Sequence, residues 1–160
     1  MEKYIKVNGV KLELTPEQVA ALTAGQVKDD LFERRYNAGY YYIDYGGNVE
    51  SDTDEEGLTD DGCYDVGNYC RDEEKMKQRA LHETLDRLLW RYSEQHGGDP
   101  EWDGKNGHWN IFREPDNQFR CDLWASRKRG GPYFHSKEVA KAAIREVVEP
   151  FCKAHPEFVW

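Results

Sequence analysis

The sequence predicts an α+β protein in which antiparallel strands and helices occupy separate stretches of the chain. Short β-prone runs recur between turn residues, and one long run carries apolar residues at helical spacing. The 160 residues include 21 aromatic side chains, enough for a hydrophobic core although 33% of the residues are charged. We expect an N-terminal β-hairpin with short helices over residues 1–39, followed by two strand-strand-strand-helix units over 40–98 and 99–160.

The first segment has the pattern of a hairpin followed by helices. Asn8 and Gly9 form the dipeptide that most readily adopts the positive φ values of a two-residue hairpin turn. The flanking strands are expected over 4–7 and 10–14. Thr15 and Pro16 are typical of a helix start, and a second short helix is expected over 26–37.

The second segment indicates three strands, an acidic loop and a long helix. The strands are expected over 40–44, 48–51 and 63–70, with the acidic loop over 52–62. Asp72 is placed to cap a helix over 73–95. The apolar residues of this helix share one face: Leu81, Leu85, Leu88, Leu89 and Tyr92.

The third segment repeats this order. Strands are expected over 108–113, 118–124 and 132–135. Ser136 is placed to cap a final helix that Pro150 should kink or end. Residues 68–74 resemble 132–138, and Ile43 and Ile111 occupy comparable places, so the two units are expected to be an internal repeat.

The net charge of −9 is concentrated in one part of the chain. Twelve of the 31 acidic residues lie between Asp44 and Glu74, where Arg71 is the one basic residue. A carboxylate-dense segment beside several tyrosines suits a strongly basic protein partner, including a nucleic-acid-binding groove. The alternative is that the acidic segment binds no partner and only keeps the protein soluble and protects the edge of a sheet. The candidate partner-binding residues are Asp52, Asp54, Glu55, Glu56, Asp60, Asp61, Tyr45 and Tyr64.

A second candidate surface is basic and aromatic. Such residues can hold phosphates and stack on bases, which would make the last unit a nucleic-acid-binding module. The alternative is a set of core aromatics and a basic hairpin turn, and the overall negative charge opposes general nucleic-acid affinity. The residues concerned are Trp109, Trp124, Arg127, Lys128 and Arg129.

No catalytic, metal or cofactor site is predicted. Residues 52–57 match the opening of an EF-hand loop, but Cys63 stands where the bidentate glutamate is needed. The four cysteines are far apart and the five histidines are scattered, so we expect structural roles for both. No run approaches the length of a membrane span and no signal-peptide core is present, so a cytoplasmic protein is expected. The absence of a catalytic signature predicts that it is not an enzyme.

Four short motifs resemble those of small phage and prophage proteins of Firmicutes. They are residues 14–19 (LTPEQV), 42–49 (YIDYGGNV), 66–69 (VGNY) and 134–140 (FHSKEVA). Some small acidic proteins in that setting are anti-CRISPR inhibitors of Cas9 that occupy its DNA-reading site with acidic side chains. The resemblance therefore implies an inhibitor of a host nucleic-acid-binding defence enzyme, with a Cas9–guide RNA complex as the foremost partner, acting in the bacterial host cytoplasm.

Overall fold

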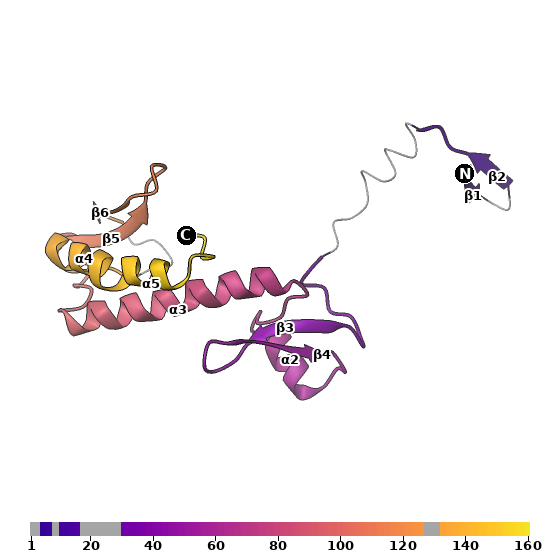
Figure 1. The fold of residues 1–160 in the computed structure, drawn as a ribbon, viewed down its shortest axis with the longest axis horizontal. Coiled ribbons are helices and arrows are strands. Elements are labelled where there is room, and N and C mark those ends of the chain that lie inside the picture. The colour runs from indigo at the N-terminus through magenta and orange to yellow at the C-terminus, as the bar shows by residue number, and fades with distance from the viewer. Residues whose placement is uncertain (1–3, 8–9, 17–29, 127–131) are drawn as a thin grey trace. The chain divides into compact units, whose positions relative to one another are not determined.

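The computed structural model describes residues 4–7, 10–16, 30–126 and 132–160 and confirms the α+β class (Figure 1). The chain divides into two compact units, 1–33 and 34–160. None of the described helices is both long and apolar enough to span a membrane.

The predicted N-terminal hairpin is confirmed. Strand β1 (Tyr4–Val7) pairs antiparallel with β2 (Val10–Glu13), with Val7 opposite Val10. The helix expected after Thr15 lies almost wholly outside the described residues. The helix expected over 26–37 is wrong for its described part, because residues 31–37 consist of two turns, a bend and irregular backbone. Asp30 accepts the N–H of Phe32, a local bond that competes with helical pairing.

The long helix α3 (Glu73–Gln95) is the central element of the second unit. The Asp72 side chain accepts the N–H of Lys75 at 3.1 Å, so the predicted cap is confirmed. Leu85 and Leu89 of the predicted apolar face are buried. Figure 1 shows α3 running past two hairpins, and it contacts elements of both halves of the unit.

The first hairpin consists of β3 (Gly39–Ile43) and β4 (Val49–Thr53), paired antiparallel. The third strand expected over 63–70 is wrong. Helix α2 (Leu58–Asp65) takes the first three residues of that stretch, 66–69 form a turn and irregular backbone, and Cys70 makes a single bridge to Tyr41. The acidic loop expected over 52–62 is divided between β4, a short connection and α2.

The second hairpin consists of β5 (His108–Arg113) and β6 (Phe119–Trp124). The strand expected over 132–135 is reduced to one bridge between Trp109 and Phe134. Ser136 caps α4 (Lys137–Ala143), as predicted.

Pro150 does not end the final helix. Helix α4 continues through a π-helical turn, η1 (Ile144–Val148), into α5 (Glu149–Ala154). Pro150 cannot donate the helical hydrogen bond to the carbonyl four residues earlier, because it has no N–H, and its ring would clash with that carbonyl in a regular α-helix. The wider turn directly before it accommodates this without breaking the helix.

The two halves of the second unit share a backbone pattern, as the sequence similarity predicts. Both hairpin turns are five residues long, 44–48 and 114–118, and have the same two backbone hydrogen bonds. In each turn the first residue donates its N–H to the carbonyl of the fifth, and the fourth residue donates its N–H to the carbonyl of the first. The fourth residue has positive φ in each, Gly47 at 87° and Asn117 at 64°. In both halves an isolated bridge then precedes a capped helix, but the first half has a further helix, α2, between its hairpin and its bridge.

The unit has two clusters of buried apolar residues. The larger joins α3 to β5, α4, η1 and α5 and includes Leu89, Ile111, Phe134 and Val148. The first hairpin contributes a separate group around Tyr40 and Tyr69, whose rings stack at 4.4 Å. This second group holds α2 and its acidic neighbours in place.

Candidate functional site

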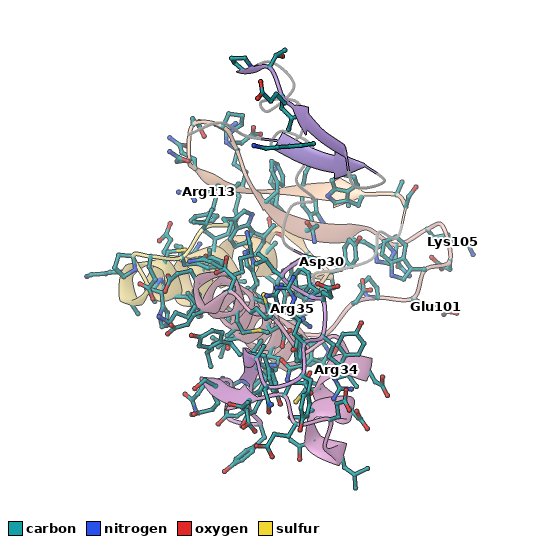
Figure 2. All side chains as sticks on the ribbon, turned by 90° about the vertical axis from the view of Figure 1, so that its right-hand side faces the viewer. Asp30, Arg34, Arg35, Glu101, Lys105 and Arg113 are labelled. Atoms are coloured by element: carbon teal, nitrogen blue, oxygen red, sulfur yellow. The ribbon has the colours of Figure 1, made fainter. Side chains whose placement is uncertain are left out.

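A buried ion pair organises the acidic segment. The Nε and Nη2 atoms of Arg34, which is labelled in Figure 2, each donate to one oxygen of Asp54 at 2.8 Å, a bidentate arrangement. Asp54 is 0% exposed and also accepts bonds from the Tyr69 hydroxyl and the Glu56 N–H. The hydrogen bonds from Arg34 lower the pKa of Asp54 to about 2. Asp54 is therefore a structural carboxylate.

Asp60 anchors the start of α2. It is 5% exposed and accepts the N–H groups of Glu55 and Gly57, at 3.0 and 2.9 Å. The Tyr40 hydroxyl donates to its other oxygen at 2.8 Å. These bonds, that from the Gly57 N–H foremost, lower the pKa of Asp60. Its carboxylate satisfies donors at the helix N-terminus and faces inward.

The six predicted acidic contact residues therefore differ in what they offer a partner. Asp54 and Asp60 are buried, and Asp61 is half-exposed and paired with Arg34 Nη1 at 2.5 Å. The remaining three are exposed: Asp52, Glu55 and Glu56. The interpretation of 52–62 as a solvated loop is wrong at Asp54 and Asp60.

The two predicted contact tyrosines differ in exposure and in their contacts within the fold. Tyr45 is fully exposed at the tip of the β3–β4 turn. Tyr64 is partly exposed on α2, packs edge-on against Tyr69, and has the Arg34 guanidinium 5.7 Å from its ring centre. Arg34 is the member of this arrangement that sequence reasoning missed, because its partner Asp54 lies 20 residues away.

The outward side of α2 carries exposed apolar side chains. Leu58 is 92% and Val66 is 73% exposed. Together with Gly62 and Asp65 they have the spacing of one helical stripe. A methyl group added at Gly62 would meet no described atom within 4 Å. We call the following set the α2 surface: Glu55, Glu56, Leu58, Asp61, Asp65 and Val66.

The candidate nucleic-acid residues are only partly described. Arg127, Lys128 and Arg129 lie outside the described residues. Trp109 is half-buried against the larger cluster, with Lys137 Nζ 5.4 Å from its ring centre. Trp124 is half-buried at the end of β6. Neither indole is among the strongly exposed rings on which a base stacks most readily.

His108 is held as a structural residue. Its Nδ1 lies 2.7 Å from an oxygen of Asp99, and the ring stacks on Trp102 at 3.4 Å. The Trp102 indole N–H donates to the other Asp99 oxygen at 2.8 Å. The contacts fix the connection between α3 and β5.

The cysteines are free thiols. Burial raises the pKa of Cys63, Cys121 and Cys152, which keeps their thiols protonated. Within the described ranges no group of three or more potential metal-binding side chains is assembled.

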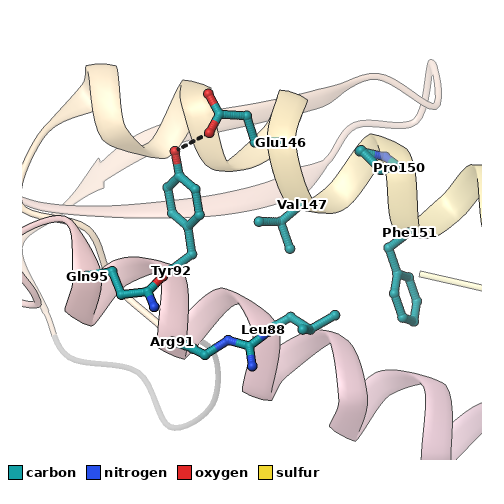
Figure 3. Close-up of a pocket in the computed structure, with 8 residues that line it drawn as sticks. All are labelled: Leu88, Arg91, Tyr92, Gln95, Glu146, Val147, Pro150 and Phe151. Atoms are coloured by element: carbon teal, nitrogen blue, oxygen red, sulfur yellow. Dashed lines mark hydrogen bonds between the residues drawn. The ribbon is translucent and has the colours of Figure 1, made fainter.

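A groove of about 310 Å³ lies between α3 and the η1–α5 segment (Figure 3). Leu88, Val147 and Phe151 form its apolar walls. The Tyr92 hydroxyl donates to Glu146 at 3.0 Å across one end. Its polar groups are of both charges, since Arg91 also lines it, and they favour no single class of ligand.

Comparison with protein-family models, curated proteins and solved structures found no significant match. The residues and geometry described above are therefore the basis of the proposals that follow.

Proposed function

We propose that this protein is a non-enzymatic interaction protein that binds a basic protein through the α2 surface. The observation that carries the proposal is the exposure of Leu58 and Val66 among carboxylates on a short helix. Exposed apolar side chains bordered by charge mark protein-binding surfaces, because covering them releases water from apolar area.

The charge of the α2 surface selects the partner. Glu55, Glu56 and Asp65 are exposed, and the described part of the chain pairs none of them with a basic side chain. Carboxylates around an apolar centre speed association with a positive surface and disfavour a negative one. Asp54 is bonded to Arg34 and Asp60 to Tyr40 inside the fold, so the backbone beneath this surface is held in place. A surface that is already ordered loses less conformational entropy on binding.

Among basic surfaces, we propose the nucleic-acid-binding groove of a host defence enzyme, with guide-loaded Cas9 as the foremost target. The resemblance to phage proteins and the excess of acidic residues support this choice. On this proposal the α2 surface takes the place of DNA phosphates in the host cytoplasm.

A pull-down tests the proposal. Purified chain is incubated with Cas9, with and without guide RNA, at low and high salt. We expect capture of the guide-loaded enzyme that weakens at high salt. The variant Leu58→Ala with Glu55→Gln and Glu56→Gln should lose capture. A control that neutralises three carboxylates elsewhere instead of two, Glu94→Gln with Glu101→Gln and Glu138→Gln, should retain it.

No capture by the wild-type chain would refute Cas9 as the target. Equal capture by both variants would refute the α2 surface. Asp54 and Asp60 are left intact because both are bonded inside the fold, so loss of binding is not confused with loss of structure.

A further inference from the structure

A small pocket of about 120 Å³ lies between α3, β5 and the residues that follow Pro132. Its described lining combines two polar side chains with aromatic and aliphatic walls: Asp86, Asn110, Leu89, Ile111, Phe134 and Trp160. One water molecule occupies about 30 Å³ in the liquid, so the pocket has room for a small organic group. It is separate from the α2 surface and from the groove of Figure 3.

Asp86 occupies an unusual position on α3. His82, Leu89 and Ser93 lie on the same stripe of the helix and all contact the body of the unit. The His82 ring packs on Phe158, Leu89 is buried, and Ser93 donates to the Tyr133 carbonyl. Asp86 places a carboxylate in this row at the rim of the pocket, where the residue is exposed to solvent.

The carboxylate of Asp86 lacks a donor. No hydrogen bond or ion pair joins it to any other residue that the structure describes, although His82, one turn earlier on α3, is close enough to influence its pKa. Packing against the body of the unit removes part of the water around Asp86 and raises the pKa of its carboxyl group, although the residue is still exposed to solvent. A bound cation would restore the lost stabilisation.

Asn110 adds a second acceptor. Its amide nitrogen donates an N–H to the Pro132 carbonyl oxygen at 3.3 Å. The amide oxygen cannot take this place, because a carbonyl oxygen has no hydrogen to donate. The amide oxygen therefore points away from Pro132, and none of the described residues donates to it. The pocket lining thus combines oxygen acceptors with the partly exposed Trp160 ring, whose face can attract a cation.

We propose that this pocket binds the guanidinium group of an organic cation. A guanidinium has five N–H donors and no acceptor, which matches the two acceptors of the lining. Its planar fork suits a carboxylate on one edge, and its flat face suits an aromatic wall. Anions are disfavoured by Asp86. The guanidinium comes either from a free small molecule or from an arginine side chain, and the proposal is independent of the α2 surface.

Isothermal titration calorimetry on the full chain tests this. The probes are agmatine, the blocked peptide acetyl-Gly-Arg-Gly-amide, and the same peptide with citrulline, a neutral urea of nearly the same shape. We expect at least one guanidinium probe to bind, and the citrulline peptide to bind at least about tenfold more weakly, as loss of a charged hydrogen bond predicts. Binding of agmatine alone identifies a free ligand, and binding of the peptide alone identifies a side chain.

Two variants complete the experiment. Asp86→Asn keeps the shape and removes the charge, and should weaken binding at least about tenfold. Glu94→Gln makes the same charge change elsewhere on α3 and should leave the affinity within about twofold, since exposed distant charges are screened. Far-ultraviolet circular dichroism of Asp86→Asn verifies its fold. Unchanged affinity in Asp86→Asn, equal binding of citrulline, or no binding of either guanidinium probe would overturn the proposal.

Discussion

Replacing Arg34 with alanine tests whether the buried ion pair holds the acidic segment together. The substitution leaves Asp54, which is 0% exposed, without its bidentate partner and removes the bond to Asp61. Removing one partner of a buried pair destabilises proteins by about 3–5 kcal/mol. The Arg34 side chain is 24% exposed, and Asp54 keeps its bonds from Tyr69 and Glu56, so the lower part of that range applies.

The pKa of Asp54 gives an independent magnitude. The fall of this pKa from 3.8 to about 2 corresponds to about 2 kcal/mol of folding free energy, since a change of one in the pKa is worth about 1.36 kcal/mol. Because the folded-state pKa is depressed, this stability is present above pH 3.8 and is lost as the pH falls towards about 2. We therefore predict that Arg34→Ala lowers the free energy of unfolding at pH 7 by about 2–3 kcal/mol.

Urea denaturation at pH 7 and pH 3 measures both effects. The wild-type chain should lose part of its stability between these pH values through Asp54, and Arg34→Ala should lose less because its Asp54 pKa is closer to the ordinary value. Arg91→Ala, which removes an exposed arginine from α3, should change stability by less than about 0.5 kcal/mol. An Arg34→Ala variant as stable as Arg91→Ala at pH 7 would refute the structural role of the pair.

Three further substitutions test the fold by the same denaturation experiment. Gly62→Ala should stabilise the chain by up to about 1 kcal/mol, because a methyl group there enters open space in a helix; destabilisation would show that Gly62 has a conformational role. Asp72→Ala should destabilise by about 1 kcal/mol through loss of the α3 cap, and an unchanged midpoint would contradict that cap. Phe134→Ala should destabilise by about 3–5 kcal/mol because the ring is fully buried in the larger cluster; a loss below 1 kcal/mol would place it outside the core.

Elements with local signals were predictable from the sequence. Strand β5 has the predicted bounds, and the caps at Asp72 and Ser136 are confirmed, since a cap depends on residues within one turn. The pairing of β1 with β2 was likewise predicted from a local signal, the Asn8-Gly9 dipeptide. These features need no knowledge of distant contacts.

Helix α2 was missed because its start depends on non-standard and distant contacts. Its N-cap is Gly57, whose N–H bonds to Asp60, and no serine or threonine marks the position. Cys63 and Tyr64 favour a strand by propensity, and packing of Tyr64 against Tyr69 overrides this. The third strand of each repeat was overestimated because one bridge and a full strand have the same local pattern.

The candidate site was only partly predictable. Composition identified the acidic segment, but it does not distinguish exposed carboxylates from bonded ones. Asp54 and Asp60 are removed from the surface by Arg34 and Tyr40, which lie 20 residues earlier in the chain. The exposure of Leu58 and Val66 depends on the same long-range packing, so the apolar part of the α2 surface had no sequence signal.

Competition with DNA tests the central claim most directly. Binding of the chain to guide-loaded Cas9 is measured by biolayer interferometry at increasing concentrations of target DNA that carries the target-adjacent motif. We predict that target DNA displaces the wild-type chain, and that Leu58→Ala with Glu55→Gln and Glu56→Gln fails to bind at any DNA concentration. Binding that target DNA leaves unchanged, or that this variant retains, would contradict the claim that the α2 surface takes the place of DNA phosphates.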